Sequence, residues 1–325
     1  MLTALFVTLC PLNLFFESVL FVAGAVFGSF LNVCITRIPL DESIVRPPSH
    51  CRECGSPIRW WHNIPLLSFL LLRGRCRDCG SHIPYRYPTV ELLTALVFVG
   101  CYICFAPTWA TLKFCIFGFL LIGLIFMDAE TGLLPHEFTY PGIATGLVFA
   151  WIAPGDSVGT RLLLLAFHKQ IDNPRALSLL DAIIGAAVGA GFFYLAWALY
   201  YLVRKRHGLG FGDITLMAMT GAFLGLKLNL LVIVCAPLVT LIFVLVMQGW
   251  EAVQNGHRSE ALFGQTSAEG RATSGPQDAG DVHATDTNEP PFLQREIPFG
   301  VFLGACSLIA VFFGEAAWAW YLGRF

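Results

Sequence analysis

Between two apolar runs the sequence reads Arg204-Lys-Arg-His-Gly-Leu-Gly-Phe-Gly-Asp213. The run before it, residues 180–203, is long enough to cross a membrane, and the run after it begins at Ile214. Three glycines in five positions precede the acid: Gly208, Gly210 and Gly212. A charge beside hydrocarbon loses part of its hydration, so an acid in this place is costly. We therefore expect Asp213 to have a function, and we expect the glycines to allow unusual backbone geometry around it.

The composition places the chain among the polytopic membrane proteins. Its 325 residues are 56% hydrophobic and 13% charged, whereas soluble proteins contain about 25% charged residues. Because roughly 20 apolar residues cross the hydrocarbon core as a helix, the sequence predicts an all-α protein with about eight transmembrane helices. The predicted spans are residues 15–36, 89–106, 110–127, 136–153, 180–203, 213–226, 228–248 and 297–321. Gly225-Leu-Lys227 is expected to form the far end of the sixth span.

The basic residues predict how these spans are oriented. The loop at residues 37–88 carries eight arginines: Arg37, Arg46, Arg52, Arg59, Arg73, Arg75, Arg77 and Arg86. Basic loops remain in the cytoplasm, so we place this loop inside and the N-terminus outside. Asp213 and Asp128, which follows the apolar run from Phe114 to Met127, then both lie at cytoplasmic ends of spans.

The same reasoning divides the chain into five parts. They are a first span at 1–36, a cytoplasmic domain at 37–88, a transmembrane core at 89–250, a cytoplasmic insert at 251–296 and a last span at 297–325. Ser, Thr, Gly, Ala and acidic residues dominate residues 251–292. Such a segment cannot bury enough apolar surface to fold by itself, so we expect it to be disordered.

Four of the eleven cysteines lie in the polar loop, as Cys51-Arg-Glu-Cys54 and Cys76-Arg-Asp-Cys79. Two Cys-x2-Cys pairs separated by 21 residues predict a tetrahedral zinc site with four thiolate ligands. The predicted ligands are Cys51, Cys54, Cys76 and Cys79. Disulfides are the alternative, but a reducing cytoplasm disfavours them. Because sulfur fills every position, we expect the zinc to be structural and to hold together a short domain that lacks a core.

Asp128 and Asp213 are the candidates for catalytic chemistry. Two carboxylates that share one proton divide the work of hydrolysis, since one activates water while the other protonates the scissile carbonyl. The alternative is that each acid is an interfacial residue near lipid headgroups, as Glu130 and Glu137 are expected to be. For Asp213 the preceding glycines favour the functional interpretation.

Further motifs occur along the chain in order. They are Phe27-Gly-Ser-Phe-Leu-Asn-Val-Cys-Ile-Thr-Arg-Ile-Pro39, Arg46-Pro-Pro-Ser-His-Cys51, Trp60-Trp-His-Asn-Ile-Pro65, Arg86-Tyr-Pro-Thr-Val-Glu-Leu-Leu-Thr-Ala95, Asp128 with Leu134-Pro135, Gly210-Phe-Gly-Asp213 and Ile297-Pro-Phe-Gly300. Each motif is weak alone, and together they are specific. Over nearly its whole length the chain resembles the type IV prepilin peptidases, the bifunctional leader peptidases and N-methyltransferases of type IV pilus and type II secretion systems.

The resemblance implies that Asp128 and Asp213 form an aspartyl dyad of the Gly-x-Gly-Asp type. It implies a prepilin or pseudopilin substrate, with a short basic leader ending in glycine and an apolar helix after it. Such an enzyme lies in the bacterial inner membrane, cuts at the cytoplasmic face and then methylates the new N-terminal residue from S-adenosylmethionine. The candidates for this second activity are Gly28, Asn32, Arg37 and Glu91. Acids that suit a basic leader are Glu42, Glu53, Asp78 and Glu130.

Two positions depart from the pattern of that family. His136 follows the Leu-Pro pair where an acidic or amide residue is usual, and Thr215 stands where lysine is common. Loss of the lysine removes a cation near Asp213, which bears on the pH optimum and not on the reaction class. Two methyltransferase candidates also have structural interpretations. Asn32 suits a hydrogen bond between helices, and Glu91 suits a charge stabilised by a helix N-terminus.

Two other functions remain open at this point. An ion-coupled transporter would use the two acids near the middle of the bilayer, on broken helices, whereas here they lie at the ends of spans. A paralogue that only methylates, or only serves as a scaffold, would not need both aspartates. Membrane lipid is the expected surrounding, no feature points to a nucleic-acid partner, and the oligomeric state is left open.

Overall fold

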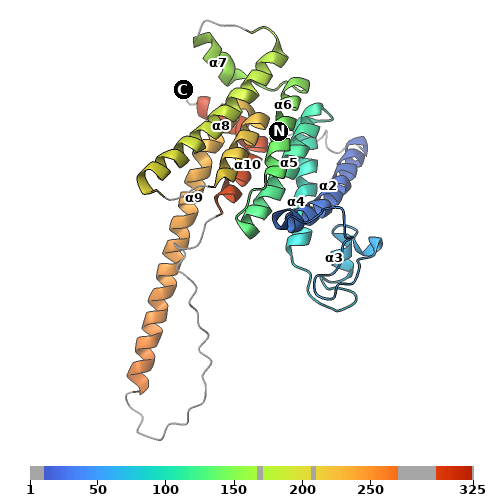
Figure 1. The fold of residues 1–325 in the computed structure, drawn as a ribbon, viewed down its shortest axis with the longest axis vertical. Helices are drawn as coiled ribbons and strands as arrows, with labels where there is room; N and C mark the ends of the chain where they lie inside the picture. The colour runs from blue at the N-terminus through green and yellow to red at the C-terminus, as the bar shows by residue number, and fades with distance from the viewer. Residues whose placement is uncertain (1–10, 167–170, 206–209, 270–297, 324–325) are drawn as a thin grey trace. The chain divides into compact units, whose positions relative to one another are not determined.

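The computed structural model describes residues 11–166, 171–205, 210–269 and 298–323. Within these ranges the chain is helical, and its extended pairing is limited to two isolated bridges, His50 with Pro57 and Arg75 with His82. The all-α class expected from composition is confirmed (Figure 1). The elements are α2 (Pro11–Arg37), η1 (Ile38–Leu40), η2 (Trp60–His62), α3 (Leu67–Leu71), α4 (Arg86–Phe105), α5 (Trp109–Thr131), α6 (His136–Ile152), α7 (Val158–Ala166), α8 (Pro174–Arg204), α9 (Phe211–Glu269) and α10 (Phe299–Leu322).

Six helices in the described ranges are long and apolar enough to cross a membrane. They span Asn13–Leu40, Arg86–Phe105, Trp109–Thr131, Pro174–Arg204, Phe211–Glu251 and Phe299–Tyr321. The expected number of eight is therefore not confirmed. The fourth expected span corresponds to α6, which has 17 residues, and the sixth and seventh both fall on α9.

A break at Gly225 divides α9 where the far end of the sixth span was expected. The residue is non-helical, with φ 74° and ψ −178°. The carboxylate of Asp181, from α8, lies against the Cα of Gly225, so a side chain at this position would collide with it. Asp181 accepts hydrogen bonds from the hydroxyl of Thr160 and from the amide of Leu226. The break is thus capped by an acid on the neighbouring helix, as the free amides at a helix start require.

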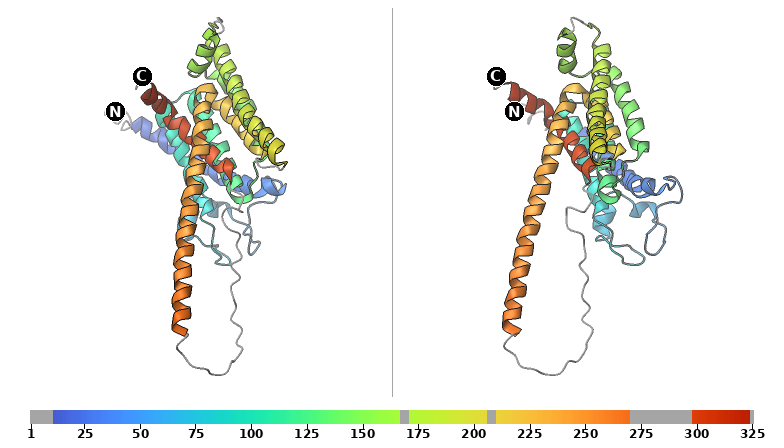
Figure 2. Two further views of the ribbon diagram at one scale, coloured as in Figure 1. Left: turned by 90° about the vertical axis from the view of Figure 1, so that its left-hand side faces the viewer. Right: turned by 60° about the vertical axis from the view of Figure 1, so that its left-hand side comes forward.

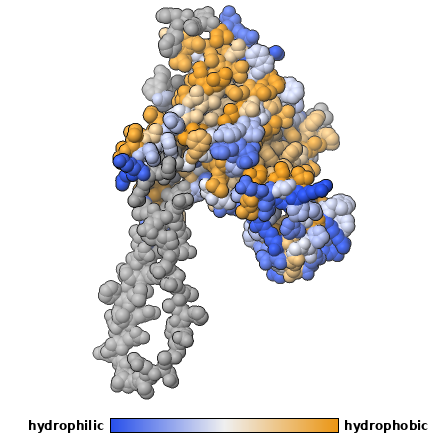
Figure 3. All heavy atoms as spheres, viewed as in Figure 1, coloured by the Kyte–Doolittle hydropathy of each residue, from blue (hydrophilic) through white to orange (hydrophobic). Residues whose placement is uncertain are grey.

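The transmembrane bundle is packed around α5, which contacts α2, α4, α6 and α10. Its largest buried side chains include Phe117, whose ring stacks on Phe223 with centroids 4.5 Å apart. Close packing of α2 on α4 depends on small residues, because a Cβ on Gly24 would lie 2.6 Å from the Cα of Ala95. Figure 2 shows α6 and α8 side by side, which agrees with their contacts. Apolar side chains cover the outer faces of the helices, and polar ones gather on the cysteine-containing loop (Figure 3).

The chain divides into two compact units, Met1–Ala236 with Pro298–Phe325, and Pro237–Ile297. In the second unit α9 continues to Glu269, so residues 251–269, the first part of the expected insert, are helical in the structure. Extending an existing helix avoids the unfavourable nucleation step, and residues of good helix propensity such as Glu251 and Ala252 favour the extension. The rest of the expected insert, from 270, lies outside the described residues.

Candidate active site and cysteine cluster

Asp128 occupies the last turn of α5, where the chain leaves the helix and turns towards α6. Gly132 ends the helix in the left-handed region, with φ 65°, and its amide donates to the carbonyl of Asp128 at 2.9 Å. This is the usual glycine C-cap. Leu134 and Pro135 follow, and α6 begins at His136. The side chain of Asp128 is buried, with the residue 6% exposed.

Asp213 lies in the first turn of α9, and its amide donates to the carbonyl of Gly210 at 3.2 Å. The residue is 7% exposed. Neither Gly210 nor Gly212 has a positive φ, so the expectation of unusual backbone geometry is wrong for these two positions, and Gly208 lies outside the described residues. What Gly212 supplies is space, because a Cβ there would lie 2.6 Å from the Cβ of Leu134.

The start of α10 closes the site on a third side. The amide of Val301 donates to Oδ2 of Asp128 at 2.9 Å, and the amide of Gly300 also donates to this carboxylate. A Cβ on Gly300 would lie 2.9 Å from both Oδ2 of Asp128 and Cδ1 of Leu134. A helix N-terminus thus holds Asp128 with free backbone amides.

The structure therefore brings together three motifs that are far apart in the sequence. Leu134 packs against Gly212, the residue before Asp213, and against Gly300, which also touches Asp128. The carboxylates of Asp128 and Asp213 lie close enough for their charges to interact. The structure thus has two buried acids, from different helices, at one end of the helical bundle.

His136 and Thr215, the two residues that depart from the family pattern, make different contacts near this site. The His136 ring stacks on Tyr140, with centroids 4.9 Å apart and an angle of 6°, and meets the edge of Phe211 at 6.0 Å. It therefore joins the start of α6 to the start of α9. The hydroxyl of Thr215 donates to the carbonyl of Gly212 at 2.9 Å, so this side chain is used within its own helix.

The four cysteines of the loop form one cluster. All ligand sulfurs of Cys51, Cys54, Cys76 and Cys79 lie within 4.8 Å of one another, and Cys51 Sγ is 3.9 Å from Cys79 Sγ. Zinc–sulfur bonds of about 2.3 Å in a tetrahedron place sulfurs ~3.8 Å apart, so the cluster fits a zinc ion. The four thiols are free rather than paired in disulfides. Hydrogen bonds from the backbone of Cys54 and then Glu53 lower the pKa of the Cys51 thiol to about 6, which favours the thiolate that zinc binds.

Each cysteine pair belongs to a repeated turn that the sequence analysis recognised only in part. The repeats are Cys51-Arg-Glu-Cys-Gly-Ser-Pro-Ile58 and Cys76-Arg-Asp-Cys-Gly-Ser-His-Ile83. In each, the glycine has a positive φ, 70° at Gly55 and 73° at Gly80, and its amide donates to the carbonyl of the first cysteine at 2.9 Å. The first cysteine in turn donates to the serine carbonyl, at 2.9 Å and 2.8 Å. The matching Gly-Ser-x-Ile endings were the signal in the sequence for these paired turns.

Three of the methyltransferase candidates lie at the junction of α2 and α4. A Cβ on Gly28 would lie 2.7 Å from the Cα of Glu91, so this glycine allows the two helices to approach. Asn32 Nδ2 donates to the carbonyl of Tyr87 at 3.0 Å, which matches the interpretation of Asn32 as a link between helices. Its Oδ1 is buried and has no partner among the described residues.

Glu91 and the fourth candidate, Arg37, fasten the polar loop to these helices. Glu91 Oε2 accepts from the amide of Leu66 at 2.7 Å, so it holds the loop rather than its own helix terminus. The Arg37 guanidinium donates to the carbonyls of Ser43 and Pro47, at 3.0 and 2.8 Å. The structure thus assigns both side chains to backbone contacts of the loop.

Arg86 forms a link that the sequence did not reveal. Its guanidinium pairs with Glu130, two residues after Asp128, and also donates to the Thr36 hydroxyl at 2.9 Å. One arginine therefore connects α2, α4 and the end of α5. Glu130 has this partner in the protein itself, so it is less available to a basic leader than the sequence analysis expected.

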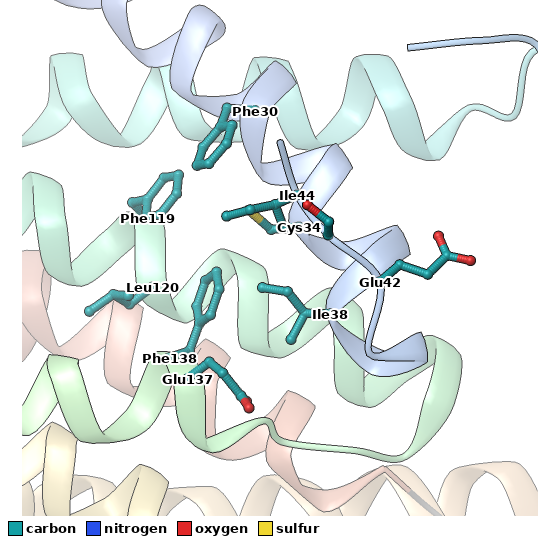
Figure 4. Close-up of a pocket in the computed structure, with 10 residues that line it drawn as sticks. Phe30, Cys34, Ile38, Glu42, Ile44, Phe119, Leu120, Glu137 and Phe138 are labelled. Carbon is teal, nitrogen blue, oxygen red and sulfur yellow. The ribbon is translucent and has the colours of Figure 1, made fainter. Parts of the chain in front are cut away.

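A cavity of about 540 Å³ lies between α2, the segment after it, α5 and α6. Figure 4 shows Phe30, Phe119 and Phe138 around it, with Cys34 between them. Two carboxylates, Glu42 and Glu137, also belong to its lining. No motif pointed to this cavity, because its lining comes from four separate segments.

The fold and the site define a multi-pass membrane protein with two buried carboxylates at one end of its bundle and a four-cysteine loop. Comparison with known proteins specifies the class. Residues 22–105 match the bacterial peptidase A24 N-terminal domain, and residues 115–245 match the type IV leader peptidase family. The chain belongs to this family, which confirms the predicted family and, with it, the prediction of a leader peptidase.

Curated relatives carry a more particular name. A prepilin leader peptidase/N-methyltransferase of Aeromonas hydrophila is 32% identical over 95% of this chain and 94% of its own length. A protein of the same name from Myxococcus xanthus is 44% identical over 64% of this chain and 56% of its own length. Another, from Neisseria gonorrhoeae, is 34% identical over 70% of this chain and 80% of its own length. No solved structure matches the chain.

Proposed function

We propose that this protein is a membrane aspartyl endopeptidase that removes the leader peptide of prepilins or type II secretion pseudopilins. The observation that carries the proposal is that Leu134 packs both against Gly212, the residue before Asp213, and against Gly300, which touches Asp128, while the α10 N-terminus donates to Asp128. The two acids come from different helices, and the interaction of their charges is what a dyad needs.

In this mechanism one carboxylate takes a proton from water while the other protonates the carbonyl oxygen of the scissile bond. The amides of Gly300 and Val301 hold Asp128 in place by their hydrogen bonds. Gly212 and Gly300 determine how closely the three motifs approach one another, because Leu134 fills the space beside both glycines.

The substrate's leader remains in the cytoplasm in this proposal, and its apolar helix lies along the bundle in the bacterial inner membrane. The dyad, the cysteine loop and the segment from residue 249 then lie on the cytoplasmic side, with the N-terminus outside, as the arginine-rich loop favours. Exposed acids such as Glu42 suit a basic leader, whereas Glu130 is paired with Arg86.

The test is cleavage of a prepilin by membranes that contain Asp213→Asn. The substitution keeps the size of the side chain and removes the titratable carboxyl, so we expect cleavage to be lost while the protein is still produced and folded. Asp156→Asn is the matched control, since Asp156 is half-exposed and shares Lys227 with Glu315. Cleavage at the normal rate by Asp213→Asn would remove this residue from the mechanism.

We also propose that the protein methylates the new N-terminal residue, as the name of its relatives implies for them. S-adenosylmethionine is the expected methyl donor, and the first span with residues 37–88 is the proposed part of the chain for this activity. Gly28, Asn32, Arg37 and Glu91 are the candidate residues for this activity. Arg37 and Glu91 also bond to the loop backbone, and Gly28 and Asn32 join α2 to α4.

The cysteine cluster is proposed to hold one structural zinc ion. Its four sulfurs fill a tetrahedral shell, which leaves no position for substrate. The loop between α2 and α4 has little buried apolar surface: only Ser68 is buried in α3, and η2 contains no buried residue. The metal therefore supplies the cross-link that a core would otherwise provide. Purified protein is expected to contain about one zinc per chain, and free thiols without metal would contradict the assignment.

A further inference from the structure

The loop between α2 and α4 exposes an apolar and aromatic surface next to its cysteine cluster. Trp60, Leu70 and Leu71 are 76%, 71% and 72% exposed. We call this surface the loop face, and it consists of the exposed apolar side chains of η2, of α3 and of the turn between them: Trp60, Trp61, Ile64, Leu67, Leu70 and Leu71. An exposed apolar patch with a polar rim marks a site of interaction with a protein or a membrane.

Contacts within the loop hold this face together. The Ser68 hydroxyl donates to the carbonyl of Trp61 at 3.3 Å, which joins α3 to η2. The ring of Phe69 lies against the ring of Tyr85, the residue before α4, with centroids 5.9 Å apart. The loop face is therefore one surface, and it lies at the end of the bundle where α4 begins (Figure 1).

A hydrogen bond shows how far this surface reaches along the membrane-spanning part of α4. The amide of Leu66 donates to Glu91 Oε2 at 2.7 Å. Glu91 lies five residues after Arg86, the first residue of α4, which is about 7.5 Å along the helix axis. The next residue, Leu92, is the first exposed apolar side chain of this span. Because α3 follows Leu66 directly, it begins close to the level at which α4 first meets lipid.

The chain around the loop face is positively charged. Residues 58–77 contain four arginines and no acid, and the arginines are Arg59, Arg73, Arg75 and Arg77. All four are exposed, and none forms an ion pair within the described residues. Tryptophan and leucine bordered by arginine are typical of a surface at the membrane interface, where the basic groups lie near lipid phosphates. The basic leader of the proposed substrate would be repelled by these charges.

We propose that the loop face inserts into the adjacent membrane leaflet and binds anionic phospholipids. The apolar side chains of η2 and α3 then lie among the upper parts of the acyl chains, and Arg59 and Arg73 pair with the lipid phosphates. Lipid covers the apolar surface that the loop cannot bury by itself. The inference needs only a chain that crosses the membrane, so it stands apart from the proposed peptidase function.

The test is depth-dependent fluorescence quenching in nanodiscs that each hold one copy of the full-length protein. A fluorescent non-canonical amino acid in place of the exposed Leu71 reports on the loop face without labelling any cysteine. The nanodisc lipids carry bromine, which quenches the label, either near the top or near the end of the acyl chain. An interfacial segment lies about 5–10 Å into the boundary between headgroups and chains. We therefore expect the shallow bromines to quench more strongly than the deep ones, and more strongly in anionic than in neutral nanodiscs.

The contribution of charge is measured with Arg59→Gln combined with Arg73→Gln, neither of which is adjacent to a cysteine of the cluster. Each basic residue near an anionic surface favours binding about fivefold, so losing both should shift the equilibrium about thirtyfold away from insertion. Quenching in anionic nanodiscs should then fall to the level in neutral ones. Arg161→Gln with Arg175→Gln is the matched control, because it removes the same charge from exposed positions in α7 and α8 and should leave quenching unchanged. An unchanged Tm in detergent shows that both double variants are folded.

Three results would overturn the proposal. Weak quenching by both bromine positions would show that the loop face lies in water. Equal quenching in anionic and neutral nanodiscs would show that the arginines do not recognise lipid charge. Shielding of the label from aqueous iodide that appears only after prepilin is added, or only with two copies per nanodisc, would indicate a protein partner instead of lipid.

Discussion

A methyl group added at Gly300 tests the contact between α10 and the proposed dyad. In Gly300→Ala the new Cβ would lie 2.9 Å from Asp128 Oδ2 and equally close to Leu134 Cδ1, whereas ordinary contacts begin at 3.4 Å. The carboxylate or the start of α10 must therefore move by about 0.5 Å, the difference between these two distances. This movement disturbs the hydrogen bond from Val301 to Asp128.

The expected effect on catalysis is larger than the effect on stability. Overpacking of this kind costs about 1–3 kcal/mol of folding free energy, while a misplacement of about 1 Å at a reacting group costs roughly 100-fold in rate. Because the expected movement is about half of that distance, we expect the kcat for prepilin cleavage to fall about 10-fold. The assay is cleavage of a prepilin by purified protein, with thermal unfolding measured in the same detergent.

Gly100→Ala is the matched control, since its Cβ would meet only the ring of Phe312, at 3.1 Å. It should lower the Tm to a similar degree without a matching loss of kcat. Wild-type kcat in Gly300→Ala, with the protein folded, would refute the inference that this surface positions a catalytic Asp128.

Three further predictions concern other parts of the fold. Gly225→Ala should lower the Tm and destabilise the protein by about 1–3 kcal/mol, because the methyl group would collide with the Asp181 carboxylate; an unchanged Tm would contradict the capped break in α9. Cys54→Ser should reduce the zinc content, measured by mass spectrometry of the metal, and should make the loop more sensitive to protease; full zinc occupancy would exclude Cys54 as a ligand. Arg86→Gln should reduce the rate of cleavage only about two- to fivefold, since a partly exposed ion pair contributes at most about 1 kcal/mol. Adding Glu130→Gln to Arg86→Gln should reduce the rate little further. If the losses of the two single variants add up in the double variant, the two residues do not act as one unit.

Most of the bundle was predictable because lipid imposes a simple rule on sequence. Long apolar runs must become helices that satisfy their own backbone groups, and α4, α5 and α8 begin or end within a few residues of the predicted limits. The rule fails where contacts between different helices determine the local backbone conformation. Nothing local shows that Asp181 caps the break at Gly225, because the two positions belong to different helices.

The candidate site shows the same division. Order and identity of the motifs indicated Asp128 and Asp213, but the role of the glycines was misjudged. Glycine before an acid was interpreted as conformational freedom, whereas Gly212 serves the close approach of Leu134, a residue far away in the sequence. Which atom lies next to a glycine depends on the tertiary structure and cannot be read from the neighbouring sequence.

The four-cysteine cluster was the most predictable site, because its ligands lie in two local turns whose spacing is visible in the sequence. The aromatic cavity was the least predictable. Its phenylalanines come from α2, α5 and α6, and each of them alone resembles an ordinary apolar residue of a membrane helix.

The central claim, that Asp128 and Asp213 act as one dyad, is tested most directly by a double-mutant comparison of cleavage rates. Asp128→Asn, Asp213→Asn and the double variant are measured with the same prepilin, at equal amounts of folded protein. Residues that act as a unit are strongly non-additive, so each single variant should lose at least about 1,000-fold and the double variant should be no slower than either. Substantial cleavage by either single variant, or losses that multiply in the double variant, would contradict the dyad.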